Sequence, residues 1–121
     1  MRGTPRPGRR VRGSRTGRPI MALLDLLGRR WALRIVWELR EARLTFRALQ
    51  NACGGVSPTV LNERLKDLRG GQIVDLVESD GYGLTPFGRE LRQALRPLTE
   101  WAERWARATV ESRTRINSQR E

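Results

Sequence analysis

The sequence predicts a mainly helical domain with one small β-hairpin, an α+β fold. Apolar residues recur at helical spacing through most of the chain after residue 18. The pattern changes at "IVDLVES", residues 73–79, whose branched side chains are typical of a strand. Asp80-Gly81 follows directly and is a strong signal for a tight hairpin. Glycine pairs at 54–55 and 70–71 separate these segments and mark helix ends.

Three helices are expected before the first glycine pair. Residues 19–27, "PIMALLDLL", predict a short apolar helix that ends at Gly28. Residues 29–42, "RRWALRIVWELREA", place Trp31, Ile35 and Leu39 on one face and other apolar residues opposite, which predicts burial against more than one neighbour. Residues 45–53 begin at Thr45, a favourable N-cap.

The next helix, residues 57–69, has one apolar face and one polar face. Ser57 can cap it, Pro58 fits its first turn, and the second glycine pair stops it. At about 100° per residue, Leu61, Leu65 and Leu68 form a seam that we expect to be buried. The far side of this helix carries Thr59, Asn62, Glu63 and Lys66.

A second strand and a long helix complete the order. "YGLT", residues 82–85, provides the returning strand. Thr85-Pro86 predicts the N-cap and first turn of a helix that runs to about residue 112. We expect Pro97 to kink this helix or to break it locally. Two short helices joined by a glycine turn and followed by a hairpin predict a winged helix-turn-helix.

Positive charge is spread unevenly along the chain, whose formal net charge is +11. Residues 1–18 hold seven arginines and no acid, whereas residues 19–121 hold 17 basic and 13 acidic side chains, a net +4. We therefore expect a disordered Arg-rich arm at 1–18, a folded domain at 19–112 and a flexible tail at 113–121. The arm favours a polyanionic partner, and an inert solvated arm is the alternative.

Missing residue types restrict the function. The chain has no histidine, which is the commonest general base and metal ligand. Cys53 is the single cysteine and cannot make an internal disulfide, which favours a location of the protein in a reducing cytoplasm. We expect the small side chain of Cys53 to be buried and to fill space in the core. No run approaches the roughly 20 apolar residues that span a bilayer. We expect no metal, no cofactor and no membrane insertion, and an enzyme is the weakest hypothesis.

The polar face of residues 57–69 predicts contacts with DNA, because such side chains can bond base edges or phosphates in a major groove. The candidate DNA-binding residues are Arg47, Ser57, Thr59, Asn62, Glu63, Lys66 and Tyr82. Arg47 and Lys66 are assigned to phosphate, and Arg29, Arg30 and Arg64 are further phosphate candidates. Arg64 lies at the edge of the seam, where it is better placed to brace the fold. A solvated face without a partner is the alternative.

The chain has four tryptophans, Trp31, Trp37, Trp101 and Trp105. Packing in the core or in a dimer is the default interpretation, since each ring buries a large area. The alternative is an apolar effector pocket lined by these rings. The apolar helix at 19–27 and the long last helix carry more apolar surface than a monomer of this size can bury, which predicts a homodimer.

Several motifs occur together in order and spacing: "LLGRRWALRIVWELREA", "VSPTVLNERLKDL", "LTPFGREL" and "PLTEWAERWA". With them, residues 19–107 resemble the HxlR-type winged-helix transcriptional regulators. The resemblance implies a DNA-binding homodimer, with an interface made mostly by its first and last helices. It also implies a palindromic operator near a promoter and an effect on transcription, with repression as the default.

Two features differ from the family pattern. Only "ESDGYG" separates the strand cores, so the wing is short and the arm is expected to compensate. Many relatives carry a cysteine-proline pair before the first helix, where this chain has Arg18-Pro19, so a thiol sensor is not carried over. Two other functions remain open: a non-specific nucleic-acid-binding or architectural protein driven by the arm, and a protein-interaction domain that has lost DNA binding.

Overall fold

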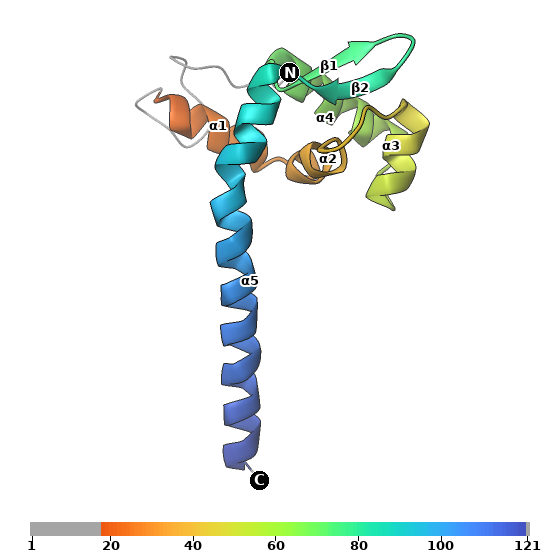
Figure 1. The fold of residues 1–121 in the computed structure, drawn as a ribbon. Coiled ribbons are helices and arrows are strands. Elements are labelled where there is room, and N and C mark those ends of the chain that lie inside the picture. The colour runs from red at the N-terminus through yellow and green to blue at the C-terminus, as the bar shows by residue number, and fades with distance from the viewer. Residues whose placement is uncertain (1–17, 121) are drawn as a thin grey trace. The chain divides into compact units, whose positions relative to one another are not determined.

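Figure 1 shows a computed structural model, which describes the backbone of residues 18–120 and the side chains of residues 18–115. Its elements are α1 (Pro19–Leu27), α2 (Ala32–Glu38), α3 (Phe46–Cys53), α4 (Pro58–Gly70), β1 (Val74–Val77), β2 (Gly81–Leu84) and α5 (Pro86–Arg120). This order confirms the mainly helical fold with a small hairpin. The chain forms two units, one ending at Leu91 and the other starting at Arg92. Apart from Arg18, the predicted Arg-rich arm lies outside the described residues.

Hydroxyl side chains cap α3 and α4 as predicted. The Thr45 hydroxyl accepts a hydrogen bond from the Ala48 amide at 3.2 Å at the start of α3. The Ser57 hydroxyl accepts one from the Val60 amide at 3.2 Å at the start of α4. Each bond satisfies an amide that has no partner within its own helix, and such a cap is worth about 1 kcal/mol.

The prediction for the second helix was too long at both ends. The helix was expected over residues 29–42, but α2 covers only Ala32–Glu38. Trp31 has a left-handed backbone with φ of 75°, so the residues before Ala32 form a turn instead of helix. The helix ends at Glu38, because the backbone of Leu39, the next residue, is non-helical.

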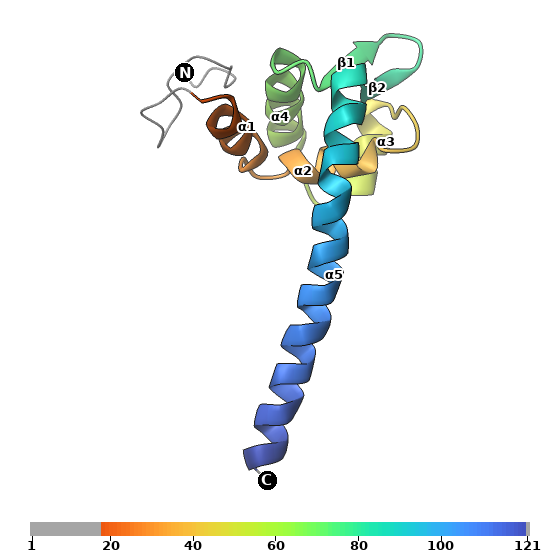
Figure 2. The same ribbon diagram turned by 60° about the vertical axis from the view of Figure 1, so that its left-hand side comes forward.

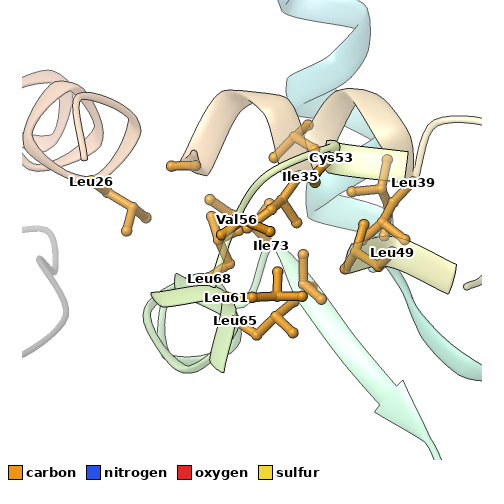
Figure 3. Close-up of a cluster of buried hydrophobic side chains, with 14 residues drawn as sticks. Leu26, Ile35, Leu39, Leu49, Cys53, Val56, Leu61, Leu65, Leu68 and Ile73 are labelled. Atoms are coloured by element: carbon orange, nitrogen blue, oxygen red, sulfur yellow. The ribbon is translucent and has the colours of Figure 1, made fainter. Parts of the chain in front are cut away.

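The core lies beneath α4, as Figure 3 shows. Leu61, Leu65 and Leu68 point into it and are each at most 1% exposed, which confirms the predicted seam. Ile35 of α2 and Leu49 of α3 meet them there and are fully buried. In both Figure 1 and Figure 2, α4 lies between α1 on one side and α3 with the hairpin on the other. Apolar packing therefore fixes the side of α4 that stays exposed.

The hairpin is a two-stranded antiparallel sheet whose register pairs Val74 with Leu84 and Val77 with Gly81. A short bridge adds Leu44 to the edge of the hairpin. The Leu44 amide donates to the Tyr82 carbonyl at 2.9 Å, and the Tyr82 amide donates to the Leu44 carbonyl at 2.8 Å. Gly81 has φ of 95°, and a Cβ there would collide with the backbone of Leu44. The hairpin is thus attached to the segment that precedes α3.

The start of α5 is seated on the base of this hairpin. The Thr85 hydroxyl donates to the Gln72 carbonyl at 2.6 Å and accepts from the Gly88 amide at 3.0 Å, which confirms the predicted cap. A Cβ at Gly88 would lie against the carbonyl oxygen of Ile73, so this position has room only for glycine.

The last helix is longer than predicted. It was expected to end near residue 112, but it continues to Arg120 as one helix that includes Pro97. No glycine or proline follows Pro97, so the sequence contains no signal that stops the helix earlier. Residues 113–120 of the predicted flexible tail are therefore helical.

Candidate nucleic-acid interface

Helices α3 and α4 are joined by a tight turn that sets where α4 begins. Gly54 ends α3 in a left-handed conformation with φ of 69°, and its amide bonds to the carbonyls of Gln50 and Asn51 at 3.2 and 3.1 Å. The Gln50 side-chain amide donates to the Val56 carbonyl at 3.4 Å across the turn. Val56 is buried, so the turn is attached to the core immediately before Ser57.

The exposed face of α4 carries the polar residues that the sequence predicts. Thr59, Asn62, Glu63 and Lys66 are all exposed. Within the described residues, the side chains of Thr59, Asn62 and Lys66 make no hydrogen bond or ion pair. Glu63 lies 3.6 Å from Arg64 and remains 61% exposed. Ser57 is exposed at the N-terminus of α4, where backbone amides also favour a phosphate.

The candidate phosphate-binding arginines are not equivalent. Arg47 is exposed on α3 and has no ion pair among the described side chains. Arg30 is also exposed, with its guanidinium 5.7 Å from the centre of the Trp31 ring. Arg64 and Arg29 are instead engaged inside the domain, each within 3.0 Å of Asp67. The bracing role expected of Arg64 agrees with this geometry.

The hairpin is acidic, a feature that the sequence interpretation overlooked. Residues 72–85 include Asp75, Glu78 and Asp80 but no lysine or arginine. Asp75 pairs with Arg43 at 2.7 Å, whereas Glu78 and Asp80 are exposed at the tip. Tyr82, a predicted DNA contact, is half-buried and packs against the core at the hairpin base. A count of charges along this segment would have revealed the acidic tip.

The four tryptophans differ in their surroundings. Trp31 is half-buried against the core, and Trp37 is exposed with the Arg40 guanidinium 4.1 Å from its ring centre. Trp101 and Trp105 stack on each other with centroids 6.0 Å apart and are each more than half exposed. Two grooves of about 770 and 610 Å³ lie among residues 19–91, and neither is lined by a tryptophan. A tryptophan-lined effector pocket stays a prediction.

The buried cysteine has the surroundings of a structural residue. Cys53 is 4% exposed and belongs to the core cluster. Burial raises the pKa of the Cys53 thiol, and the nearby Glu38 carboxylate raises it further, while Arg34 acts in the opposite direction. Among the described side chains, no group of three histidine, cysteine or acidic residues is placed to hold a metal ion.

A helix-turn-helix with an exposed polar second helix, followed by a hairpin, defines a DNA-binding protein of the winged helix-turn-helix class. Residues 26–110 match the HxlR-like helix-turn-helix family, and the chain belongs to this family. It is a transcriptional regulator with a helix-turn-helix DNA-binding domain, and it is not an enzyme.

Curated relatives agree with this assignment. The chain is 32% identical over 91 residues to the HTH-type transcriptional regulator YvaP of Bacillus subtilis, covering 68% of this chain and 82% of that protein. It is 28% identical over 96 residues to an HTH-type transcriptional regulator of Methanocaldococcus jannaschii, covering 74% and 88% of the two chains.

Solved structures give the same result. Quinone-bound YodB from B. subtilis is 28% identical with a TM-score of 0.66, over 70% of this chain and 94% of that chain. A possible HxlR family transcriptional factor from Thermoplasma volcanium is 29% identical with a TM-score of 0.62, over 70% and 82%. Among the described helices, none has the length and apolar character needed to cross a membrane.

Proposed function

We propose that the protein represses transcription as a cytoplasmic homodimer that binds a palindromic operator. The observation that carries this proposal is the exposed face of α4, where Thr59, Asn62 and Lys66 are free to bond DNA. Hydroxyl and amide groups of this kind read base edges in a major groove, while Lys66 with Arg47 suits phosphate. A dimer bound beside a promoter would exclude RNA polymerase from it.

Exposed apolar surface supports the homodimer. On α5, Leu98, Trp101, Trp105 and Val110 are each more than half exposed. On α1, Ile20 and Leu24 are each 54% exposed. Large apolar side chains gathered in this way on two helices are typical of a surface that a partner covers. In a dimer with twofold symmetry, the two copies of α4 would meet half-sites about 34 Å apart, which requires a palindrome.

The proposal also includes a role for the N-terminal arginines and a small-molecule effector. Arginines of residues 1–18 would add phosphate contacts, since residues 72–85 of the hairpin contain no lysine or arginine. YodB was solved with a quinone bound, and we extend to this chain the expectation of a small apolar effector. If the arm dominated binding, the protein would instead be a non-specific nucleic-acid binder.

A footprint on the DNA upstream of the protein's own gene tests the DNA-binding proposal. A specific regulator should prefer one site over random DNA by about a thousandfold or more. Asn62→Ala should reduce that preference by about 1–3 kcal/mol, and Thr59→Ala should act in the same direction. Asn51→Ala is the matched control, because Asn51 is an exposed asparagine of α3 outside the polar face of α4. Equal affinity for all sequences would instead support the non-specific binder.

Light scattering at micromolar concentration tests the homodimer. The wild-type protein should have the mass of two chains, and the double variant Trp101→Ala/Trp105→Ala should shift toward the monomer. Arg107→Ala removes an exposed side chain from a different side of the same helix and should leave the mass unchanged. A wild-type monomer would refute the homodimer.

A further inference from the structure

Asp67 sits at the centre of a charged cluster on the inner side of α4. Its carboxylate oxygen Oδ2 lies 2.7 Å from Nη1 of Arg64 and 3.0 Å from Nη1 of Arg29. Arg29 also lies 3.5 Å from Asp25 of α1. The side chains of Asp67 and Arg29 are each 14% exposed, and that of Arg64 is 18% exposed. We call Asp25, Arg29, Arg64 and Asp67 the Asp67 cluster.

The cluster joins two parts of the domain that are distant in sequence. Arg29 follows α1 in the turn before α2, whereas Asp67 lies in the second half of α4. The two helices lie side by side in Figure 2. A Cβ at Gly71, just after α4, would come within 2.9 Å of the Leu26 side chain, so α1 also approaches the end of α4 there. The Arg29–Asp67 pair therefore connects α4 to the end of α1.

Apolar packing holds α4 along its leucine seam, and the Asp67 cluster lies outside that seam. A groove of about 610 Å³ lies next to the end of α4 and is lined by Leu23 and Leu26 of α1, by Gly70, Gly71 and Ile73, and by Phe87 and Leu91 of α5. On this side the ion pairs therefore supply a directional contact between α4 and the end of α1. Removing one partner of a largely buried pair leaves the other charge without compensation.

We propose that Arg29 is a positioning residue: by pairing with Asp67, it holds α4 at the angle at which the exposed face reads DNA. This inference rests on the proposed sequence-specific function. It assigns Arg29 a different role from the phosphate contact predicted from sequence. Thr59 lies eight residues before Asp67, about 12 Å along the helix. A rotation of about 5° at Asp67 would move Thr59 by about 1 Å, which exceeds the narrow range of hydrogen-bond distances.

The test compares Arg29→Gln with Arg89→Gln, which removes the same charge from an exposed residue of α5 that has no ion pair among the described side chains. The ratio of affinities for operator and random DNA should fall about tenfold in Arg29→Gln, comparable to weakening one good base contact, and stay unchanged in Arg89→Gln. Both variants should keep the salt slope of the wild type. Arg29→Lys keeps the charge and should restore most of the ratio. Asp67→Asn should reproduce the loss if Arg29→Gln is too unstable to measure.

Two outcomes would overturn the proposal. A uniform loss on all sequences, with a salt slope lower by about 1.8 for the homodimer in Arg29→Gln alone, would identify a phosphate contact instead. An unchanged affinity ratio would show that the Arg29–Asp67 pair does not orient α4.

A measurement without DNA separates this inference from the proposed function. In the free protein, NMR amide shifts of residues 57–62 should change in Arg29→Gln and not in Arg89→Gln. If they change although the wild type prefers no DNA site, the specific function fails and the positioning role stands. If the wild type is specific and these amides do not shift in Arg29→Gln, the positioning role fails alone.

Discussion

Replacing Arg47 or Lys66 by glutamine removes one exposed cation from α3 or α4 without disturbing the core. Each cation that neutralises a phosphate displaces condensed counterions and adds about 0.9 to the slope of log affinity against log salt. A homodimer loses two cations per substitution, so the slope should fall by about 1.8. Between about 50 and about 200 mM salt, wild-type affinity should then fall about twelvefold more than that of the variant. A monomer would give a difference of only about 3.5-fold.

Fluorescence anisotropy with labelled DNA at four or more salt concentrations measures these slopes. Arg34→Gln is the control, because the Arg34 guanidinium already bonds Glu38 at 2.8 Å and the Ala52 carbonyl at 3.1 Å. Its slope should equal that of the wild type. The loss from Arg47→Gln or Lys66→Gln should be the same on operator and on random DNA, since phosphates are shared by all sequences. An unchanged slope in either variant would refute the phosphate assignment of that residue.

Three other substitutions or treatments have defined outcomes. Gly88→Ala should lower the free energy of unfolding, measured in urea, by about 1–3 kcal/mol, because the added Cβ would meet the Ile73 carbonyl. An unchanged free energy of unfolding would contradict that close approach. Because burial raises the pKa of the Cys53 thiol, iodoacetamide should label the native protein slowly at neutral pH and faster as the pH rises, and labelling as fast as in urea would argue against burial. Deleting residues 1–17 should leave the thermal midpoint unchanged and lower the salt slope by about 0.9 for each engaged arginine, whereas equal slopes would show an inert arm.

Features set by neighbouring residues were predictable from the sequence. Thr45, Ser57 and Thr85 each cap a helix by accepting from an amide three residues later, a bond that depends only on local chain geometry. The seam beneath α4 follows from helical periodicity in the same way. Local geometry and periodicity together therefore predict the exposed side of α4, and with it most of the candidate site.

Features set by tertiary contacts were not predictable in this way. Trp31 adopts a positive φ that tryptophan rarely takes, and no pattern of apolar residues reports such a conformation. The pairing of Arg29 with Asp67 joins residues far apart in the chain, so spacing does not reveal it. As a result, the sequence assigned Arg29 to phosphate, whereas its charge is engaged within the domain.

The acidic hairpin has a consequence for how the domain meets DNA. Arg47 and Lys66 give the α3–α4 side exposed positive charge, while Glu78 and Asp80 place negative charge at the hairpin tip. Opposite charges at separate places form an electric dipole, and the strong field around a polyanion exerts a torque on it. During a diffusional approach, such a torque would favour orientations in which α4, and not the hairpin tip, faces the phosphates. The dipole would thereby increase the fraction of collisions that are productive, and this gain would fade as salt shortens the range of the field.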